Sequence, residues 1–146
     1  MSTENVVNIV LCGSLSPITN AHLRSFEDAK DTMALRGVTV KRGILSPVSD
    51  AYKKTDLAPA SHRLAMCRLA TEGSWIQVSS WEADQEGYTP TLYALRVIQK
   101  DTDPDIPLYL LGGADLLHSF TVPGVWAEAD VRKLHFPRER NKNSDV

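Results

Sequence analysis

The stretch that decides the fold is Val6-Val7-Asn8-Ile9-Val10-Leu11-Cys12-Gly13. It is rich in β-branched residues, almost continuously apolar and closed by a glycine, which is typical of a strand buried on both faces of a parallel sheet. Residues 19–35 follow with apolar side chains at near-helical spacing, and either Thr19 or Asn20 can cap this helix before Gly37 ends it. The order of strand, loop and helix predicts a βα unit.

The rest of the chain repeats this alternation. We expect strands over residues 38–45, 75–79 and 107–111, helices over residues 62–70 and 91–100, and a loop over residues 46–50. The buried face of the last helix holds either Leu92, Leu95 and Ile98 or Tyr93 and Val97. Four such alternations predict an α/β fold, a Rossmann-like parallel sheet with helices on both faces that binds ligands beyond the carboxyl ends of its strands.

The composition excludes several classes of protein. The chain has 146 residues, 42% hydrophobic and 23% charged, which suits one globular domain. A formal net charge of -2 gives no general attraction to nucleic acids or membranes, so neither is an expected partner and any anion site must be local. The N-terminus fits neither a signal peptide nor a transmembrane span, so we expect an intracellular protein. Cys12 and Cys67 lack the spacing of a disulfide framework or zinc site, and both are predicted to be small buried side chains.

The loop after the first strand carries the most informative chemistry. In Gly13-Ser14-Leu15-Ser16-Pro17-Ile18-Thr19-Asn20-Ala21-His22, the glycine allows a phosphate to approach closely, and Ser14 offers a hydroxyl. Thr19 and His22 lie three residues apart, so both can face one anion at the first turn of the helix. A plain strand-to-helix connection with an exposed histidine explains these residues about equally well. Neither GxxxxGK[ST] nor GxGxxG occurs, which excludes the P-loop and the dinucleotide-dehydrogenase fingerprint.

Four segments, in order from Val6 to about Asp130, resemble one family. GSLSPITNAHLRSFEDAKD resembles the signature GSF-[N]-PIT-x-x-H, ILSPVSDAYKKTDLAPASHRLAMCRLA the segment ISPVxDAYKKxxLxPAxHR, WEADQEGYTPT a WE-rich loop, and LLGGADLLHSFTVPGVW the segment GADLLxSFxxPxxW. These are motifs of the eukaryotic-type nicotinamide mononucleotide adenylyltransferases, in the nucleotidyltransferase superfamily with the [HT]xxH motif. The resemblance implies the nucleotidyltransferase form of the Rossmann-like fold, related to that of the adenine nucleotide alpha hydrolases.

The resemblance also implies a reaction in NAD biosynthesis. The 5′-phosphate of nicotinamide mononucleotide attacks the α-phosphorus of ATP in line and gives NAD and pyrophosphate, with Mg²⁺ accompanying ATP. Nicotinic acid mononucleotide is a second implied acceptor of AMP, and it gives the corresponding acid dinucleotide. Such a step needs positioning and charge neutralisation more than acid-base chemistry. The implied partners are small-molecule nucleotides. Family members occur in the nucleus, cytosol and mitochondria, and the cytoplasm is favoured here because no basic cluster resembles a nuclear signal.

Site residues follow from the resemblance position by position. It implies that His22 is catalytic and binds the ATP phosphates, and that Gly113 and Asp115 face the ATP ribose and phosphates. The mononucleotide contacts that it implies are Gly13, Ser14, Leu15, Thr19, Tyr52, Lys53, Lys54, Tyr88, Thr91, Val125 and Trp126. No residue is expected to ligate a metal. Without the resemblance, Lys54 is a solvated lysine and Trp126 a core side chain.

The sequence also departs from the family pattern. Leu15 and Ser16 replace the usual Phe and Asn, and Tyr88 replaces a ring-contacting Trp but keeps an aromatic face. Residues 131–146 lack the ISSTxxR segment that clamps the ATP triphosphate, so we expect an incomplete nucleotidyltransferase domain over residues 1–130, a divergent disordered tail and strongly reduced activity.

Two alternatives follow from that departure. The chain is either an active adenylyltransferase or an impaired, truncated isoform that only binds nucleotide, forms a homo-oligomer or associates with a full-length paralogue through an exposed sheet edge. Another adenylyl- or cytidylyltransferase on the same fold is a more distant alternative, because the DAYKK and GADLLHSF stretches argue against it.

Overall fold

The computed structural model describes residues 5–52, 56–119 and 121. In chain order the elements are β1 (Asn5–Gly13), α1 (Asn20–Leu35), β2 (Val38–Pro47), α2 (Ala60–Ala70), β3 (Ile76–Val78), α3 (Thr91–Thr102), β4 (Leu108–Leu110) and α4 (Ala114–Ser119). The strands form a parallel sheet in the order β3-β2-β1-β4. The predicted alternation is therefore confirmed, and with it the α/β class.

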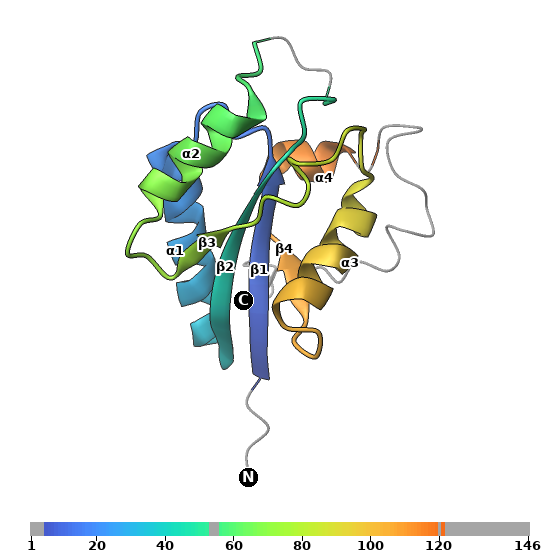
Figure 1. Ribbon diagram of the computed structural model, residues 1–146. Helices are drawn as coiled ribbons and strands as arrows, with labels where there is room; N and C mark the ends of the chain where they lie inside the picture. The colour runs from blue at the N-terminus through green and yellow to red at the C-terminus, as the bar shows by residue number, and fades with distance from the viewer. Residues whose placement is uncertain (1–4, 53–55, 120, 122–146) are drawn as a thin grey trace. The chain divides into compact units, whose positions relative to one another are not determined.

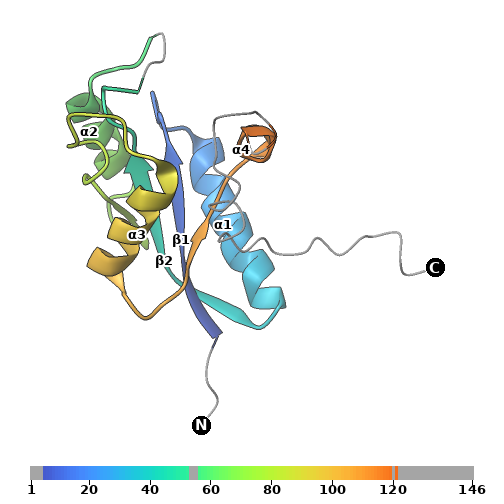
Figure 2. The same ribbon diagram turned by 90° about the vertical axis from the view of Figure 1, so that its right-hand side faces the viewer.

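The strand order reverses direction at β1. From β1 the chain moves outward through β2 and β3, and then crosses to the other side of β1 to form β4. Helices α1 and α2 lie on one face of this sheet and α3 lies on the other, as Figure 1 and Figure 2 show. The expectation of helices on both faces is confirmed. Such a reversal leaves a crevice at the carboxyl ends of the strands, where open α/β sheets bind their ligands.

The chain divides into two compact units, Met1–Gly112 and Gly113–Val146. The first unit contains the sheet and helices α1 to α3. Of the second unit the structure describes α4 and the residues beside it, and Asp115 is in the first turn of that helix. The predicted tail over residues 131–146 lies outside the described residues, and the domain boundary near residue 130 stays a prediction.

Several predicted boundaries shift by a few residues. Strand β2 continues through Ser46 and Pro47, which were predicted to be loop, because these residues still pair with Cys12 and Gly13 of β1 and the Val48 N–H donates to the Gly13 carbonyl at 3.0 Å. Helix α2 begins at Ala60 rather than at residue 62, since the Asp50 carboxylate accepts the Ala60 N–H at 2.8 Å and so satisfies the start of the helix. Helix α3 runs on to Thr102.

Helix α1 has the predicted ends. Thr19 is its N-cap in an extended conformation, with φ of -127°. Beyond Leu35, Arg36 is the C-cap and Gly37 follows with φ of +76°, a left-handed conformation that glycine adopts without steric penalty. The sequence therefore determines where the first βα unit begins and ends.

The main hydrophobic core lies between the sheet and α1. Phe26 of α1 is fully buried and meets Trp75 edge to face, with 6.1 Å between the ring centroids. Both rings cover Gly43 in the middle of β2: a Cβ atom added there would lie 2.8 Å from Trp75 and 2.9 Å from Phe26. On α3, Leu95 and Ile98 are buried and Tyr93 is exposed, which selects the first of the two faces predicted for that helix.

Gly43→Ala is expected to lower the free energy of unfolding by about 1–3 kcal/mol, because a methyl group at this position must displace two packed aromatic rings. Urea denaturation monitored by circular dichroism measures the change. Gly87→Ala is the control, since nothing lies within 4 Å of a Cβ there, and it should change stability by less than about 0.5 kcal/mol. Equal stabilities for the two variants would contradict the packing described for β2.

A polar network lies toward the amino-terminal ends of the strands. Strand pairing between β1 and β2 shifts by one residue after Val7, and the buried Asn8 occupies this irregularity: its carbonyl accepts the Arg42 N–H at 3.0 Å and its amide donates to Asp103 at 2.9 Å. The hydrogen bond from Asn8, followed by those from Lys41 and Arg42, holds the pKa of Asp103 below its ordinary value. This network ties the end of α3 to β1 and β2.

Membrane-spanning helices and the state of the two cysteines can be examined in the described residues. No helix described is both long and apolar enough to cross a membrane. Both cysteines are free thiols. Cys67 is fully buried, as predicted. Cys12 as a whole residue is half-buried, but its thiol is enclosed beside the polar side chains of Ser46 and Glu82, so the prediction of a small buried apolar side chain is wrong for Cys12.

Candidate functional site

The candidate site is built at the carboxyl ends of β1 and β2. Because these strands are parallel neighbours, the loop from Gly13 to Thr19 and the loop that follows Pro47 leave the sheet side by side. Helix α1 begins at the end of the first loop and has no acidic residue in its first turn, so its positive N-terminal end is not neutralised by the helix itself. The predicted residues Gly13, Ser14, Leu15, Thr19 and His22 all lie in this first loop and turn.

His22 is held in one orientation by Thr19. The Thr19 N–H donates to Nδ1 of the imidazole at 2.9 Å, and the Thr19 hydroxyl oxygen lies 3.0 Å from the same nitrogen. This is a capping box in which a histidine at the third helical position takes the place of the usual Glu or Gln. Since Nδ1 accepts the backbone proton, the ring hydrogen is on Nε2, so the ring presents a donor on its side away from Thr19.

This geometry changes the expected role of Thr19. The spacing of Thr19 and His22 predicts that both face one anion, whereas in the structure the amide and hydroxyl of Thr19 both turn to the His22 ring. Thr19 therefore orients His22, and its contact with the mononucleotide stays a prediction. The three-residue spacing was the correct signal, because it places the two groups in contact.

Leu15 anchors the loop to the core. Its side chain is only 2% exposed and belongs to the main core cluster, while its backbone has φ of 47°, in the left-handed region that leucine rarely adopts. Such a conformation costs of the order of 1–2 kcal/mol, which burial of the leucine side chain offsets. The loop is therefore held in a defined conformation by packing.

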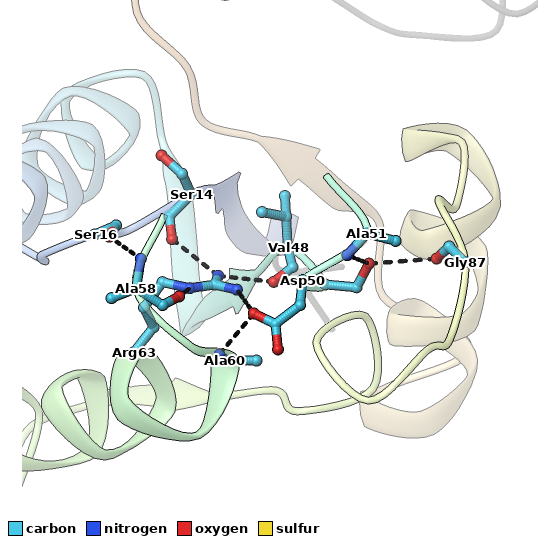
Figure 3. Close-up of polar contacts among 10 residues, drawn as sticks. Ser14, Ser16, Val48, Asp50, Ala51, Ala58, Ala60, Arg63 and Gly87 are labelled. Carbon is cyan, nitrogen blue, oxygen red and sulfur yellow. Dashed lines mark hydrogen bonds and ion pairs between the residues drawn. The ribbon is translucent and has the colours of Figure 1, made fainter. Parts of the chain in front are cut away.

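Arg63 of α2 connects the two loops (Figure 3). Its side chain is fully buried, and its guanidinium lies between Ser14 and Asp50. Nη1 donates to the carbonyls of Ser14 at 3.0 Å and Val48 at 2.7 Å, Nε donates to the Ala58 carbonyl at 2.7 Å, and Nη2 forms an ion pair with the Asp50 carboxylate at 3.1 Å. One side chain thus binds three separate stretches of backbone at the end of the sheet.

Neighbouring serines extend these connections. The Ser16 hydroxyl accepts the Ala58 N–H at 2.9 Å, which fastens the first loop to the start of α2. The Ser49 hydroxyl accepts the Ala51 N–H at 3.2 Å and donates to the Gly87 carbonyl at 3.3 Å, next to Tyr88. Figure 3 shows these contacts beside those of Arg63. The two loops and the segment before α3 therefore form one hydrogen-bonded surface.

Tyr52 and Tyr88 are predicted mononucleotide contacts that the structure brings together. Their rings are stacked with 6.3 Å between centroids and an interplanar angle of 27°, although 36 residues separate them in sequence. Both are accessible, at 40% and 61% exposure. Burial against its surroundings, followed by Tyr52 and Glu82, raises the pKa of Tyr88 above its ordinary value. Thr91, also predicted, is partly buried at the first position of α3.

A buried carboxyl group lies beneath this surface. Glu82 is 5% exposed, and the Ser46 hydroxyl at the end of β2 donates to its Oε2 at 2.9 Å. Burial raises the pKa of Glu82 above its ordinary value, an effect that the hydrogen bonds from Ser46 and Cys12 partly reverse. Burial likewise raises the pKa of the Cys12 thiol, and the negative charge of Glu82 adds to this. Cys12 is therefore protonated and is not a reactive thiolate.

Glu82→Gln is expected to flatten the dependence of stability on pH. An acid whose pKa is raised in the folded state stabilises the fold fully below its ordinary pKa, and this contribution is lost as the pH rises through the raised value. Thermal unfolding at pH 5 and pH 8 should show a smaller decrease for Glu82→Gln than for the unmodified chain. Glu86→Gln, at an exposed position of the same segment, is the matched control and should follow the unmodified chain. A Glu82→Gln profile parallel to the control would contradict this account.

The remaining predicted residues are either outside the described residues or in the second unit. Lys53, Lys54, Val125 and Trp126 are outside the described residues. Gly113 and Asp115 belong to the second unit, in which the Leu116 N–H donates to the Gly113 carbonyl at 3.1 Å at the start of α4. Their proposed contacts with nucleotides stay predictions.

Comparison with known proteins identifies the family. Residues 10–141 match the model of the cytidylyltransferase-like family. The chain belongs to this family. The matched range begins in β1 and contains the His22 loop and the Arg63 contacts, so the candidate site lies within the part of the chain that matches the family model.

Individual relatives of this cytidylyltransferase-like chain carry a narrower name. This chain is 46% identical over 137 residues to a nicotinamide/nicotinic acid mononucleotide adenylyltransferase of Oryza sativa subsp. japonica. The match covers 88% of this chain and 55% of the relative. A protein of the same name from Schizosaccharomyces pombe is 40% identical, over 86% of this chain and 39% of the relative. A nicotinamide/nicotinic acid mononucleotide adenylyltransferase 1 from Bos taurus is 36% identical, over 91% of this chain and 63% of the relative. The resemblance inferred from the four segments is thus confirmed. The chain spans about half the length of the curated relatives it matches.

Reasoning from the sequence missed Arg63 and Glu82 as members of the site. A signal for Arg63 was present, because Ala60, Arg63, Leu64 and Cys67 recur at the spacing of one helical face, which places a charged residue on the buried side of α2. Glu82 stands next to Trp81 and Ala83, which is a weaker signal of burial. Neither signal identifies the hydrogen-bond partners of these side chains, since the partners lie up to 49 residues away in sequence.

Proposed function

We propose that this chain transfers AMP from ATP to the 5′-phosphate of nicotinamide mononucleotide, and also to nicotinic acid mononucleotide, with release of pyrophosphate. The α-phosphorus of ATP is attacked in line, so the protein must hold two polyanionic substrates together and neutralise the charge that develops between them. The names of the relatives support this reaction, as do the four motif segments.

The observation that carries the proposal is the His22 arrangement. A neutral imidazole with its hydrogen on Nε2 stands in the first turn of α1, beside a loop that ends a parallel strand. Such a donor binds phosphate oxygens and strengthens its hydrogen bond as negative charge accumulates in the transition state. Because Thr19 fixes the ring beforehand, little reorganisation is needed when ATP binds.

The mononucleotide is proposed to occupy the neighbouring part of the surface. Its phosphate meets the loop of Gly13, Ser14 and Leu15, and its pyridine ring packs against Tyr88 beside Tyr52 and Thr91. Lys53, Lys54, Val125 and Trp126 are further proposed contacts that rest on the resemblance alone. The accessible Tyr52–Tyr88 pair supports this placement, since a cationic pyridinium is attracted to the face of an aromatic ring. Gly113 and Asp115 are proposed ATP contacts.

Magnesium enters the proposal as part of the Mg-ATP substrate. Within residues 5–52, 56–119 and 121, no three His, Cys, Asp or Glu side chains gather in a way that could hold a metal ion. The cation would accompany the triphosphate and lower its charge, while His22 and the α1 N-terminus interact with the phosphate oxygens.

The proposal is tested by assaying the purified, folded chain for NAD formation from nicotinamide mononucleotide and Mg-ATP, coupled to alcohol dehydrogenase. Formation of NAD and pyrophosphate in equal amounts is the expected result. A folded chain that binds nicotinamide mononucleotide without turnover would favour the alternative of a nucleotide-binding protein. A folded chain that neither binds nor turns over the nucleotide would overturn the proposal.

We further propose a cytoplasmic location and self-association, or association with a longer relative, through β4. This strand stands at one end of the order β3-β2-β1-β4, and the edge of a parallel sheet can pair with another chain. Light scattering after gel filtration tests the association. A monomer at all concentrations, alone and mixed with a longer relative, would contradict it.

A further inference from the structure

We propose that Arg63 is a positioning residue that turns the Leu15 N–H toward the phosphate of the mononucleotide. This inference rests on the function proposed above. It concerns a side chain that is fully buried and does not itself reach the substrate, so its action must pass through the backbone that it holds.

The direction of the Ser14 carbonyl determines where the next backbone N–H points. Arg63 Nη1 donates to the Ser14 carbonyl at 3.0 Å, which points that oxygen toward α2 (Figure 3). The peptide bond between Ser14 and Leu15 is trans, since the cis bond of this loop joins Ser16 and Pro17. In a planar trans peptide the C=O and N–H point in opposite directions. The Leu15 N–H therefore points away from Arg63, on the side of the loop that α2 does not cover.

The same nitrogen orients a second peptide. Nη1 also donates to the Val48 carbonyl at 2.7 Å, so the loops after β1 and β2 are held by one atom. Nε and Nη2 fix the plane of the guanidinium through Ala58 and Asp50. Because all three nitrogens of the planar guanidinium donate hydrogen bonds, the group cannot rotate to release one carbonyl alone. The direction of the Leu15 N–H therefore depends on the whole set of Arg63 hydrogen bonds.

Other features of the loop agree with this role. Leu15 keeps a left-handed backbone, with φ of 47°, while its side chain is locked in the core. The positive charge of Arg63, which is paired with an Asp50 side chain that is 62% exposed, lies directly behind the Ser14–Leu15 peptide. A cation behind the carbonyl end polarises the peptide so that its N–H becomes a stronger donor to an anion.

The substitution that tests this is Arg63→Lys, which keeps the charge and removes the fork. In the folded variant, the KM for nicotinamide mononucleotide should rise by about tenfold to a hundredfold, while the KM for ATP stays within about twofold. Arg68→Lys, on the exposed side of α2, is the matched control and should keep both constants. If Arg63 has only a structural role, Arg63→Lys will lower the melting temperature and the folded fraction but leave both KM values unchanged, and that result would overturn the proposal.

A second measurement uses the unmodified chain and so does not depend on how well the variant folds. Nicotinamide mononucleotide is titrated into ¹⁵N-labelled protein, and the amide resonances of the loop are followed. The Leu15 amide proton should move downfield as it donates to the phosphate, while the Arg63 Nε–H stays protected from exchange. Shifts confined to other residues would overturn the role of Arg63. The absence of any shift, together with no NAD formation, would instead count against the proposed function.

Discussion

Replacing His22 by alanine is expected to lower kcat for NAD formation by about 10²–10³-fold, with a change of less than about threefold in the KM for nicotinamide mononucleotide. The Nε2 donor of His22 is fixed before ATP binds, because Nδ1 already accepts the Thr19 N–H at 2.9 Å. A donor of this kind contributes most where charge develops, so its loss affects turnover more than binding. Steady-state kinetics with each substrate varied in turn measures both constants.

His22→Gln separates catalysis from capping. Glutamine is a common residue at the third position of a capping box, so it can accept the Thr19 N–H and preserve the start of α1, but it does not place a donor where Nε2 stands. We expect His22→Gln to lose activity nearly as completely as His22→Ala while keeping stability, whereas the alanine variant also loses about 0.5–2 kcal/mol. Full activity in His22→Gln would show that His22 acts only as a cap.

Phe26→Ala is expected to cause the largest loss of stability, about 3–5 kcal/mol. Phe26 is fully buried and lies against both Trp75 and Gly43, so its removal leaves a cavity that neither neighbour can fill. Because domains of this size are stable by about 5–15 kcal/mol, the variant should unfold at a much lower urea concentration. Urea denaturation followed by circular dichroism gives the value.

The control for Phe26→Ala is Leu69→Ala, since Leu69 is 73% exposed and its truncation should change stability by less than about 0.5 kcal/mol. The two core substitutions should also be coupled. Gly43→Ala should cost less in the Phe26→Ala background than alone, because the added methyl group then has space. A loss below about 1 kcal/mol for Phe26→Ala, or strict additivity with Gly43→Ala, would contradict the packing described here.

Most of the fold could be predicted because its signals are local. The apolar run of β1, the cap at Thr19 and the glycine after α1 each depend on a few neighbouring residues, and all are where the sequence indicates. The ends of β2 and α2 were less predictable, since they depend on partners distant in sequence. Pro47 remains in its strand because Gly13 pairs with it, and Ala60 begins a helix because Asp50 accepts its N–H.

Within the candidate site, the contacts that could be predicted from the sequence are the local ones. The spacing of Thr19 and His22 brings them together within one helical turn, although as partners of each other. The Tyr52–Tyr88 stack depends on the resemblance, because no local pattern relates residues in separate loops. The contacts of Arg63 and Glu82 form only when β1, β2 and α2 are packed together, so the partners of a buried charge cannot be read from its own segment.

The central claim is that nucleotide binds at the carboxyl ends of β1 and β2, on the loop that Arg63 and Thr19 organise. A crystal structure of the chain with nicotinamide mononucleotide tests this most directly. We expect the phosphate to accept a hydrogen bond from the Leu15 N–H, with the Thr19–His22 contact retained and the pyridine ring against Tyr88. A mononucleotide bound away from these loops, or a phosphate that leaves the Leu15 N–H without contact, would contradict the account.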